Sequence, residues 1–176
     1  MKVTIFQSIK DTKSPHHITI PTALRRIQEG KSESLIAKIR AGEKPKKKEL
    51  PIVCFSGEFS SRADDALFEH SGFIILDFDH VNVSEVKKSL ATDDYIHSCW
   101  VSPSGDGIKA LVKVTNPERH RDHFRALCTY FNKRYCLEVD ESGINESRAC
   151  FESFDPDIIV KDNSKKFGAF TSEFAE

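Results

Sequence analysis

Four apolar residues run directly into two carboxylates in Phe73-Ile74-Ile75-Leu76-Asp77-Phe78-Asp79. The turn-like pair Ser71-Gly72 precedes this run, so the pattern predicts a short buried strand. Residues two apart on a strand point to the same face. We therefore expect Asp77 and Asp79 to project together, with Phe78 in the core on the other side.

Two carboxylates on one face make a site of hard oxygen ligands. Mg²⁺ and Mn²⁺ prefer such ligands together with waters and substrate phosphates. Two such ions about 4 Å apart stabilise both the attacking and the leaving oxygen in phosphoryl transfer. An isolated Asp-x-Asp pair can equally end a strand in solvent, so the rest of the sequence must decide between the two interpretations.

The periodicity of the remaining sequence predicts a mixed α/β chain, and the proline, glycine and asparagine positions separate its elements. Ser84 is a candidate cap for its third helix. The expected helices are Ile18–Glu29, Ser34–Arg40, Ser84–Leu90 and Glu118–Tyr135. The other expected strands are Val3–Phe6, Ile52–Phe55, Ile96–Val101 and Ile108–Val114, with short candidates at Leu137–Asp140, Ala149–Phe154 and Ile158–Val160.

The length of 176 residues and a hydrophobic content of 39% fit a single globular domain. We assign this domain to residues 1–160, with an N-terminal strand and helices in 1–49 and the motifs in 50–160. Residues 161–176 carry charge and scattered phenylalanine without periodicity, which indicates a tail or linker.

Bulk properties point to a cytoplasmic protein without excluding many partners. The N-terminus lacks a signal-peptide pattern and the chain has no run of 18 apolar residues, so we expect neither secretion nor a membrane span. Five cysteines without a C-x-x-C pair indicate reduced core residues. The formal net charge of -1 neither predicts nor excludes a nucleic-acid partner.

A second motif, Ser102-Pro103-Ser104-Gly105-Asp106-Gly107-Ile108-Lys109, joins two predicted strands. Its glycines expose backbone N–H groups, and it adds hydroxyls and a lysine, which together are the parts of a triphosphate cradle. The candidate phosphate-binding residues are Ser102, Ser104, Gly105, Gly107 and Lys109. The spacing excludes a P-loop, and an ordinary hairpin turn would account for the segment equally well.

A third motif spans residues 137–148. Asp140 ends a short apolar run and could complete a metal shell, whereas Arg148 could neutralise phosphate with its fork of donors. Either residue could instead be a surface charge.

Three further features leave two interpretations open. The run Lys44-Pro45-Lys46-Lys47-Lys48 is either a solvated loop or a contact to phosphates. Arg62 could border a nucleotide or lie on the surface. Trp100 could stack on a base or fill the core.

Together, the three motifs resemble the archaeo-eukaryotic primase (primase-polymerase) superfamily, and more specifically the VirE N-terminal-like primase domains of bacterial mobile elements and phages. The resemblance spans roughly residues 50–160. It implies an RRM-like α/β (α+β) core, an antiparallel-rich sheet with packed helices, as in a primase-polymerase catalytic domain. Asp77, Asp79 and Asp140 would bind two Mg²⁺ or Mn²⁺ ions, while Ser104, Lys109 and Arg148 would meet the nucleotide phosphates. Lys109 stands where many relatives have histidine.

By this resemblance the chain is a metal-dependent, template-dependent nucleotidyltransferase that acts in replication of a mobile element or phage. Its partners would be an NTP or dNTP, a single-stranded DNA template, and a helicase or primase C-terminal region. Two alternatives stay open. One is a catalytically silent module that binds single-stranded nucleic acid or nucleotide and recruits a helicase; the other is a metal-dependent nuclease, because the same carboxylates can activate water.

Overall fold

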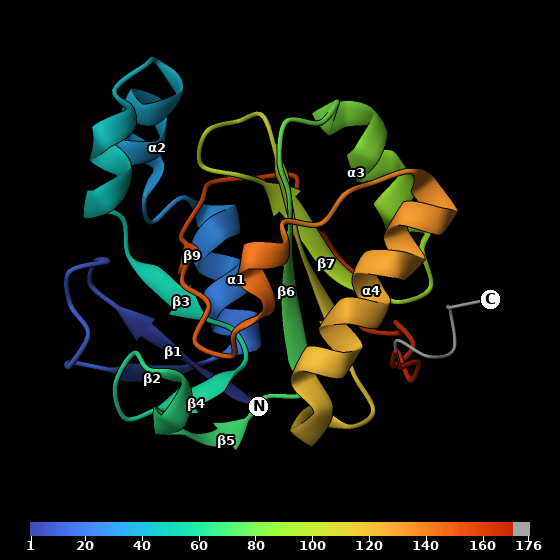
Figure 1. Cartoon of the computed structure of the whole chain (residues 1–176). Helices are drawn as coiled ribbons and strands as arrows, with labels where there is room; N and C mark the ends of the chain where they lie inside the picture. Colours follow the sequence, from blue (N-terminus) through green and yellow to red (C-terminus); the bar gives the residue numbers. More distant parts are fainter. Residues whose placement is uncertain (171–176) are drawn as a thin grey trace.

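The computed structural model describes residues 1–170, which form a mixed α/β fold of antiparallel sheets and helices (Figure 1). The α-helices are α1 (Ile20–Glu29), α2 (Glu33–Arg40), α3 (Val83–Thr92) and α4 (His120–Tyr135). Short 3₁₀ helices are η1 (Lys44–Glu49), η2 (Asp64–Ala66), η3 (Pro117–Arg119) and η4 (Glu141–Ile144). The strands are β1 (Lys2–Phe6), β2 (His16–Thr19), β3 (Ile52–Cys54), β4 (Gly57–Phe59), β5 (Leu67–His70), β6 (Phe73–Phe78), β7 (Ile96–Val101), β8 (Ile108–Lys113), β9 (Cys150–Phe151) and β10 (Ile159–Val160).

Two four-stranded sheets and one ribbon organise these strands. The N-terminal sheet has the order β2-β1-β3-β9, the second sheet has the order β10-β7-β8-β6, and β4 pairs with β5. In the second sheet, β6 and β7 are joined through α3 and both pair antiparallel with β8, which lies between them. The strand β6 is therefore at one edge of this sheet.

The alternation of residues along β6 divides the core into two layers. Ile74, Leu76 and Phe78 pack with buried residues of α3 and α4 on one face of the second sheet. Phe73 and Ile75 pack on the other face with α1 and the N-terminal sheet. Figure 1 shows α3 and α4 on one side of β6 and α1, β1 and β3 on the other. Asp77 has the same parity as Phe73 and Ile75, so its side chain faces the N-terminal sheet.

The structure corrects several local expectations. The cap of α3 is Asn82 and not Ser84, because the Asn82 side chain accepts a hydrogen bond of 3.2 Å from the backbone N–H of Glu85. Residues 137–140 are not a regular strand, although the N–H of Asp140 donates to the carbonyl of Asp77 at 2.9 Å. The lysine run forms the 3₁₀ helix η1 instead of an open loop. Polar strands β2, β4 and β5 were not predicted.

Part of the segment that the sequence indicates as a tail packs against the domain. Phe167 is buried, and its N–H donates to the carbonyl of Lys113 at 2.7 Å. Residues 171–176 lie outside the described part of the chain. Within residues 1–170, no helix has the length and apolar character needed to cross a membrane.

Candidate functional site

A buried ion pair lies where β6 and β8 run side by side. Asp77 and Lys109 are direct register partners on these strands. Their side chains meet at 2.7 Å between Nζ and Oδ1, and the two residues are only 7% and 8% exposed. Charges as buried as these are tolerated only when they are paired. The strand register therefore fixes a carboxylate and an ammonium group on the inner face of the second sheet.

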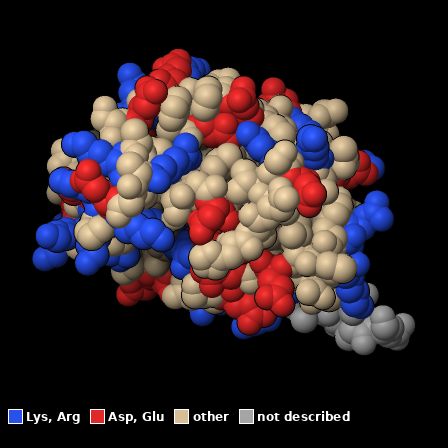
Figure 2. All heavy atoms as spheres, turned by 90° about the horizontal axis from the view of Figure 1, so that it is seen from above, with Lys and Arg blue, Asp and Glu red and all other residues tan. Residues whose placement is uncertain are grey.

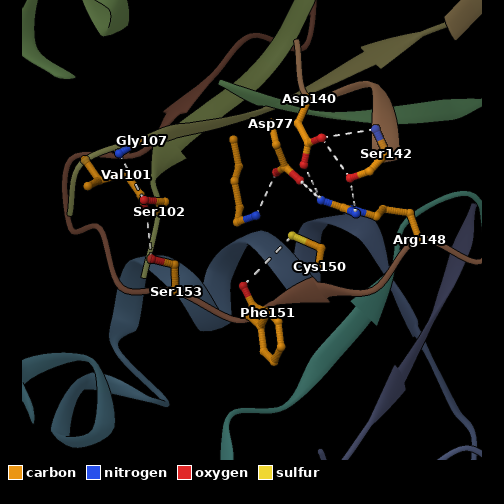
Figure 3. A network of polar contacts seen from close by, with 11 residues as sticks. Asp77, Val101, Ser102, Gly107, Asp140, Ser142, Arg148, Cys150, Phe151 and Ser153 are labelled. Carbon is orange, nitrogen blue, oxygen red and sulfur yellow. Dashed lines mark hydrogen bonds and ion pairs between the residues drawn. The ribbon is translucent and has the colours of Figure 1, made fainter. Parts of the chain in front are cut away.

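Arg148 joins this pair to the third predicted acid. Its Nη2 lies 2.8 Å from Oδ2 of Asp77 and 3.1 Å from Oδ2 of Asp140. The other oxygen of Asp140, Oδ1, accepts hydrogen bonds from the N–H and the hydroxyl of Ser142 and thereby caps η4. Figure 3 shows the Asp77, Asp140 and Arg148 side chains pointing toward one another. Residues far apart in sequence thus meet at one guanidinium nitrogen.

These groups line one polar pocket of about 490 Å³ between the two sheets. Asp79 also lines it, so both carboxylates of the strand end reach the same space. Asp77 is buried in its floor, whereas Asp79 is exposed. The charged lining consists of three carboxylates, Asp77, Asp79 and Asp140, and four cations, Lys47, Arg62, Lys109 and Arg148. The cations outnumber the carboxylates, which favours an anionic ligand.

The pKa values of the pair follow from burial and charge. Burial would raise the pKa of Asp77, but Lys109 and Arg148 outweigh it and hold this pKa below its usual value. Burial would lower the pKa of Lys109, but the carboxylate of Asp77, which accepts a hydrogen bond from this ammonium group, acts against burial and raises it. Both side chains are therefore charged at neutral pH. Burial raises the pKa of the neighbouring Cys150 to about 11, so this thiol stays protonated.

The carboxylate oxygens of the pocket are suitable ligands for a hard divalent ion, but some of these carboxylates are already paired with cations of the chain. Three carboxylates line one pocket, and carboxylate oxygens are the ligands that Mg²⁺ and Mn²⁺ prefer. Both oxygens of Asp77 face Lys109 and Arg148 instead of a shared open position. Among residues 1–170, no three His, Cys, Asp or Glu side chains stand in an arrangement ready to hold a metal ion. To hold such an ion together with Asp79, Asp77 and Asp140 would have to exchange their present partners Lys109 and Arg148.

The Ser-Gly hairpin is not brought into the pocket. Of its predicted phosphate ligands, only Lys109 lines the pocket; Ser102, Ser104, Gly105 and Gly107 do not. The N–H of Gly107 donates to the hydroxyl of Ser102 at 3.1 Å, and the N–H of Gly105 donates to the carbonyl of Ser102 at 3.0 Å. Figure 3 shows Ser102 and Gly107 beside the carboxylate cluster, not within it. These N–H groups are used inside the turn.

The lysine run provides one pocket residue. Lys47 lines the pocket, with its ammonium group 5.0 Å from the centre of the Phe151 ring. Burial and the nearby Lys109 lower the pKa of Lys47, against the opposing effect of Asp77 and Asp79. Lys44 and Lys48 are exposed on the same 3₁₀ helix. In Figure 2, lysine and arginine gather on the side of the molecule where α2 lies.

The sequence also left two interpretations for Arg62 and Trp100. Arg62 lines the pocket, and its guanidinium donates to the carbonyl of Ile9 at 3.2 Å. Trp100 is fully buried in the core, so it has no face for stacking on a base.

Sequence reasoning missed the residue that holds the Arg148 loop. One Asp64 oxygen accepts hydrogen bonds from the N–H of Ser147 at 3.1 Å and from its hydroxyl at 2.6 Å. The other oxygen accepts from Asn145 at 2.8 Å and from Arg121 at 3.1 Å. Asp64 and Ser147 are 83 positions apart, and Asp64 lies in no apolar run, so no local pattern signals this contact.

The fold and the pocket define a mixed α/β domain with a charged pocket between two antiparallel sheets. A family model described as "BT4734-like, N-terminal domain" matches residues 45–159, which is more than half of the chain. The chain belongs to this family. No curated protein and no solved structure shows a significant match.

This assignment corrects the resemblance read from the motifs. The matched family is a different one from the archaeo-eukaryotic primase superfamily, and none of the comparisons supports a primase. The motif match was misleading because short Asp-x-Asp and Ser-Gly patterns also arise where a strand ends in a charged pocket and a hairpin turns tightly. What remains is the geometry of the pocket itself.

Proposed function

We propose that the pocket is the active site of a metal-dependent nucleotidyltransferase that takes a nucleoside triphosphate. One observation carries the proposal: Asp77, Asp79 and Asp140 line the same pocket as Lys109 and Arg148, although these residues come from separate stretches of the chain. Carboxylates with cations beside them are what a metal–phosphate substrate requires. This rests on the residues alone and not on membership of a primase family.

In the proposed reaction the hydroxyl at a nucleic-acid end loses its proton to water, its oxygen bonds to the α-phosphorus, and the bond from that phosphorus to the leaving pyrophosphate breaks. Asp77, Asp79 and Asp140 would hold the divalent ions, which would stabilise the negative charge that develops in phosphoryl transfer. Lys109 contributes a point charge from the pocket floor. Arg148 contributes a planar fork that fits phosphate oxygens. Lys47, on the opposite wall, adds a third cation that could meet the outer phosphates.

An RRM-like core remains part of this proposal. Its support is the order β6, α3, β7, β8, α4, in which two strands joined by a helix flank a third strand. The fourth strand of the sheet, β10, pairs with β7, which leaves the β6 edge beside Asp140. The backbone of Asp140, the third carboxylate, is hydrogen-bonded to this edge at Asp77.

The test is incorporation of labelled nucleotides into a primed single-stranded DNA template with Mg²⁺ or Mn²⁺. We expect product from the wild-type chain and none from the Asp77→Asn/Asp79→Asn double variant. Arg125→Gln, on the exposed surface of α4, is the matched control and should leave the product yield unchanged. Equal product from the double variant and the wild type would refute the catalytic role of these carboxylates.

A second candidate is a silent module that binds nucleotide or single-stranded nucleic acid and recruits a helicase. The excess of cations over carboxylates in the pocket favours it, because a pocket with net positive charge can bind phosphate without any metal. It predicts nucleotide binding in EDTA with no turnover. If calorimetry detects nucleotide binding only when a divalent ion is present, this candidate is rejected.

A further inference from the structure

Two of the three carboxylates of the pocket, Asp77 and Asp140, already have counter-ions from the chain itself. One oxygen of Asp77 accepts a hydrogen bond from Lys109, and the other accepts one from Arg148. An oxygen of Asp140 accepts from the same Arg148 nitrogen. Lys109 is only 8% exposed and lines the pocket. Any ligand that takes an oxygen of Asp77 must therefore leave a cation without its partner.

A divalent ion that binds without another ligand leaves these cations unpaired and offers them no replacement anion. To bind Asp77 and Asp140 it must displace Lys109 and Arg148, and both cations then face a double positive charge at close range. A buried charge without a partner is strongly unfavourable, and repulsion between like charges adds to the cost. Lys47 on the opposite wall would increase this repulsion. Binding of a lone metal ion by Asp77 and Asp140 is thus electrostatically unfavourable.

A triphosphate removes the penalty because it supplies anionic oxygens to the displaced cations. Arg148 can pair with phosphate through two donors, and Lys109 can do so as a point charge. The carboxylates are then free for the metal that the triphosphate carries. Without metal, by contrast, the triphosphate would compete with Asp77 and Asp140 for the same cations.

We propose that Lys109 and Arg148 act as internal counter-ions that couple the two ligands, so that the pocket binds a divalent ion and a nucleoside triphosphate tightly only together. This inference rests on the proposed function, which names both ligands. Coupling between two ligands is reciprocal and typically about 5- to 150-fold. The metal should therefore raise the affinity for triphosphate by the same factor by which triphosphate raises the affinity for metal.

The experiment is a titration of Mn²⁺ followed by the electron paramagnetic resonance signal of the free ion. The protein is titrated alone and with a nucleoside triphosphate that has a methylene bridge between the α and β phosphorus atoms. A protein-free titration corrects for Mn²⁺ bound by the triphosphate in solution. For the wild type we expect Mn²⁺ to bind at least about fivefold more weakly without the triphosphate than with it.

The variant Arg148→Gln gives two effects of opposite sign. Its Asp77 and Asp140 lose one counter-ion, so Mn²⁺ alone should bind about tenfold more tightly than to the wild type, whereas the triphosphate should bind more weakly. Arg148→Lys keeps the charge and should stay close to the wild type in the Mn²⁺-only titration. Arg125→Gln is the control and should change neither affinity. The Arg148 side chain is 26% exposed, and thermal unfolding verifies that each variant is folded.

The outcomes separate the two proposals. Equal Mn²⁺ affinity with and without triphosphate, or an unchanged Mn²⁺ affinity in folded Arg148→Gln, would overturn the counter-ion coupling and leave the proposed function standing. No Mn²⁺ binding in any arm, even with triphosphate, would overturn the proposed function together with it. The wild-type comparison needs no variant, so the coupling is tested even if Arg148→Gln does not fold.

Discussion

The pocket around Asp77 and the turn between β7 and β8 both involve strands of the second sheet, but their polar groups are used differently. In the pocket, side chains from separate stretches of the chain meet, and Arg148 contacts two carboxylates at once. In the turn, Gly105 and Gly107 donate to Ser102, and Arg40 donates to the Ser102 carbonyl from outside at 3.0 Å. Polar groups that hydrogen-bond to one another within five residues stabilise the shape of the turn. Side chains that meet from distant parts of the chain are instead available to exchange these partners for a ligand.

The largest effect should come from breaking the buried pair. Asp77→Asn leaves Lys109 and Arg148 without their shared anion, and removing one partner of a buried pair typically costs about 3–5 kcal/mol. Asp79→Asn alters an exposed residue of the same pocket and should cost less than about 0.5 kcal/mol while still impairing nucleotide incorporation. Urea unfolding of both variants measures the difference. Equal destabilisation would contradict the contrast between a buried and an exposed carboxylate.

The same pair predicts how stability depends on pH. The pKa of Asp77 is held below its usual value in the fold, so its ionisation contributes stability above the unfolded pKa of about 3.9. That contribution is lost as the pH falls from there through the folded pKa. The wild type should therefore exceed Asp77→Asn in unfolding free energy by a constant amount at neutral pH, and the gap should shrink below about pH 4. A gap that stays constant down to pH 2.5 would contradict this.

Breaking the turn should cost less and should act through packing. A Cβ at Gly107 would lie 2.8 Å from the carbonyl oxygen of Phe78 and 3.2 Å from Oγ of Ser102. The backbone oxygen cannot move away cheaply, so Gly107→Ala should lower the unfolding free energy by about 1–3 kcal/mol. Ser104→Ala, in the same turn, should change neither stability nor triphosphate affinity. Weaker triphosphate binding by Ser104→Ala would restore the turn as a phosphate cradle.

The loop that carries Arg148 offers an intermediate effect. Asp64→Asn removes the charge that orders Ser147 and Asn145, and it should destabilise the fold by about 1–2 kcal/mol, because hydrogen bonds to a charged group are strong but this one is partly exposed. Triphosphate binding should weaken as well, since Arg148 is less well positioned. Asp65→Asn is the matched control one residue away. Stability loss without weaker binding would make Asp64 a purely structural residue.

These contrasts also explain how far the sequence could predict the molecule. The buried strand, its two carboxylates and the long helix follow from local periodicity, and they lie close to their expected positions. Asp140 lies beside Asp77 because the short segment 137–140, which the sequence marks as extended, runs along the β6 edge of the second sheet. The use of the turn could not be predicted, because hydroxyl and glycine residues serve a ligand and an internal hydrogen bond equally well. The contact of Asp64 with Ser147 depends on the tertiary fold alone.

The smallest expected effect separates two lysines of one short helix. Lys47 lines the pocket at about half-burial, whereas Lys48 is exposed and lines no part of it. Lys47→Ala should weaken triphosphate binding about two- to fivefold, which is the size of one partly screened charge interaction, and Lys48→Ala should not weaken it measurably. The Lys47 effect should also diminish in 0.5 M salt, because salt screens a charge that reaches solvent. Calorimetry at two salt concentrations measures both lysines, and equal losses for Lys47→Ala and Lys48→Ala would indicate a diffuse basic surface instead of a cation placed in the pocket.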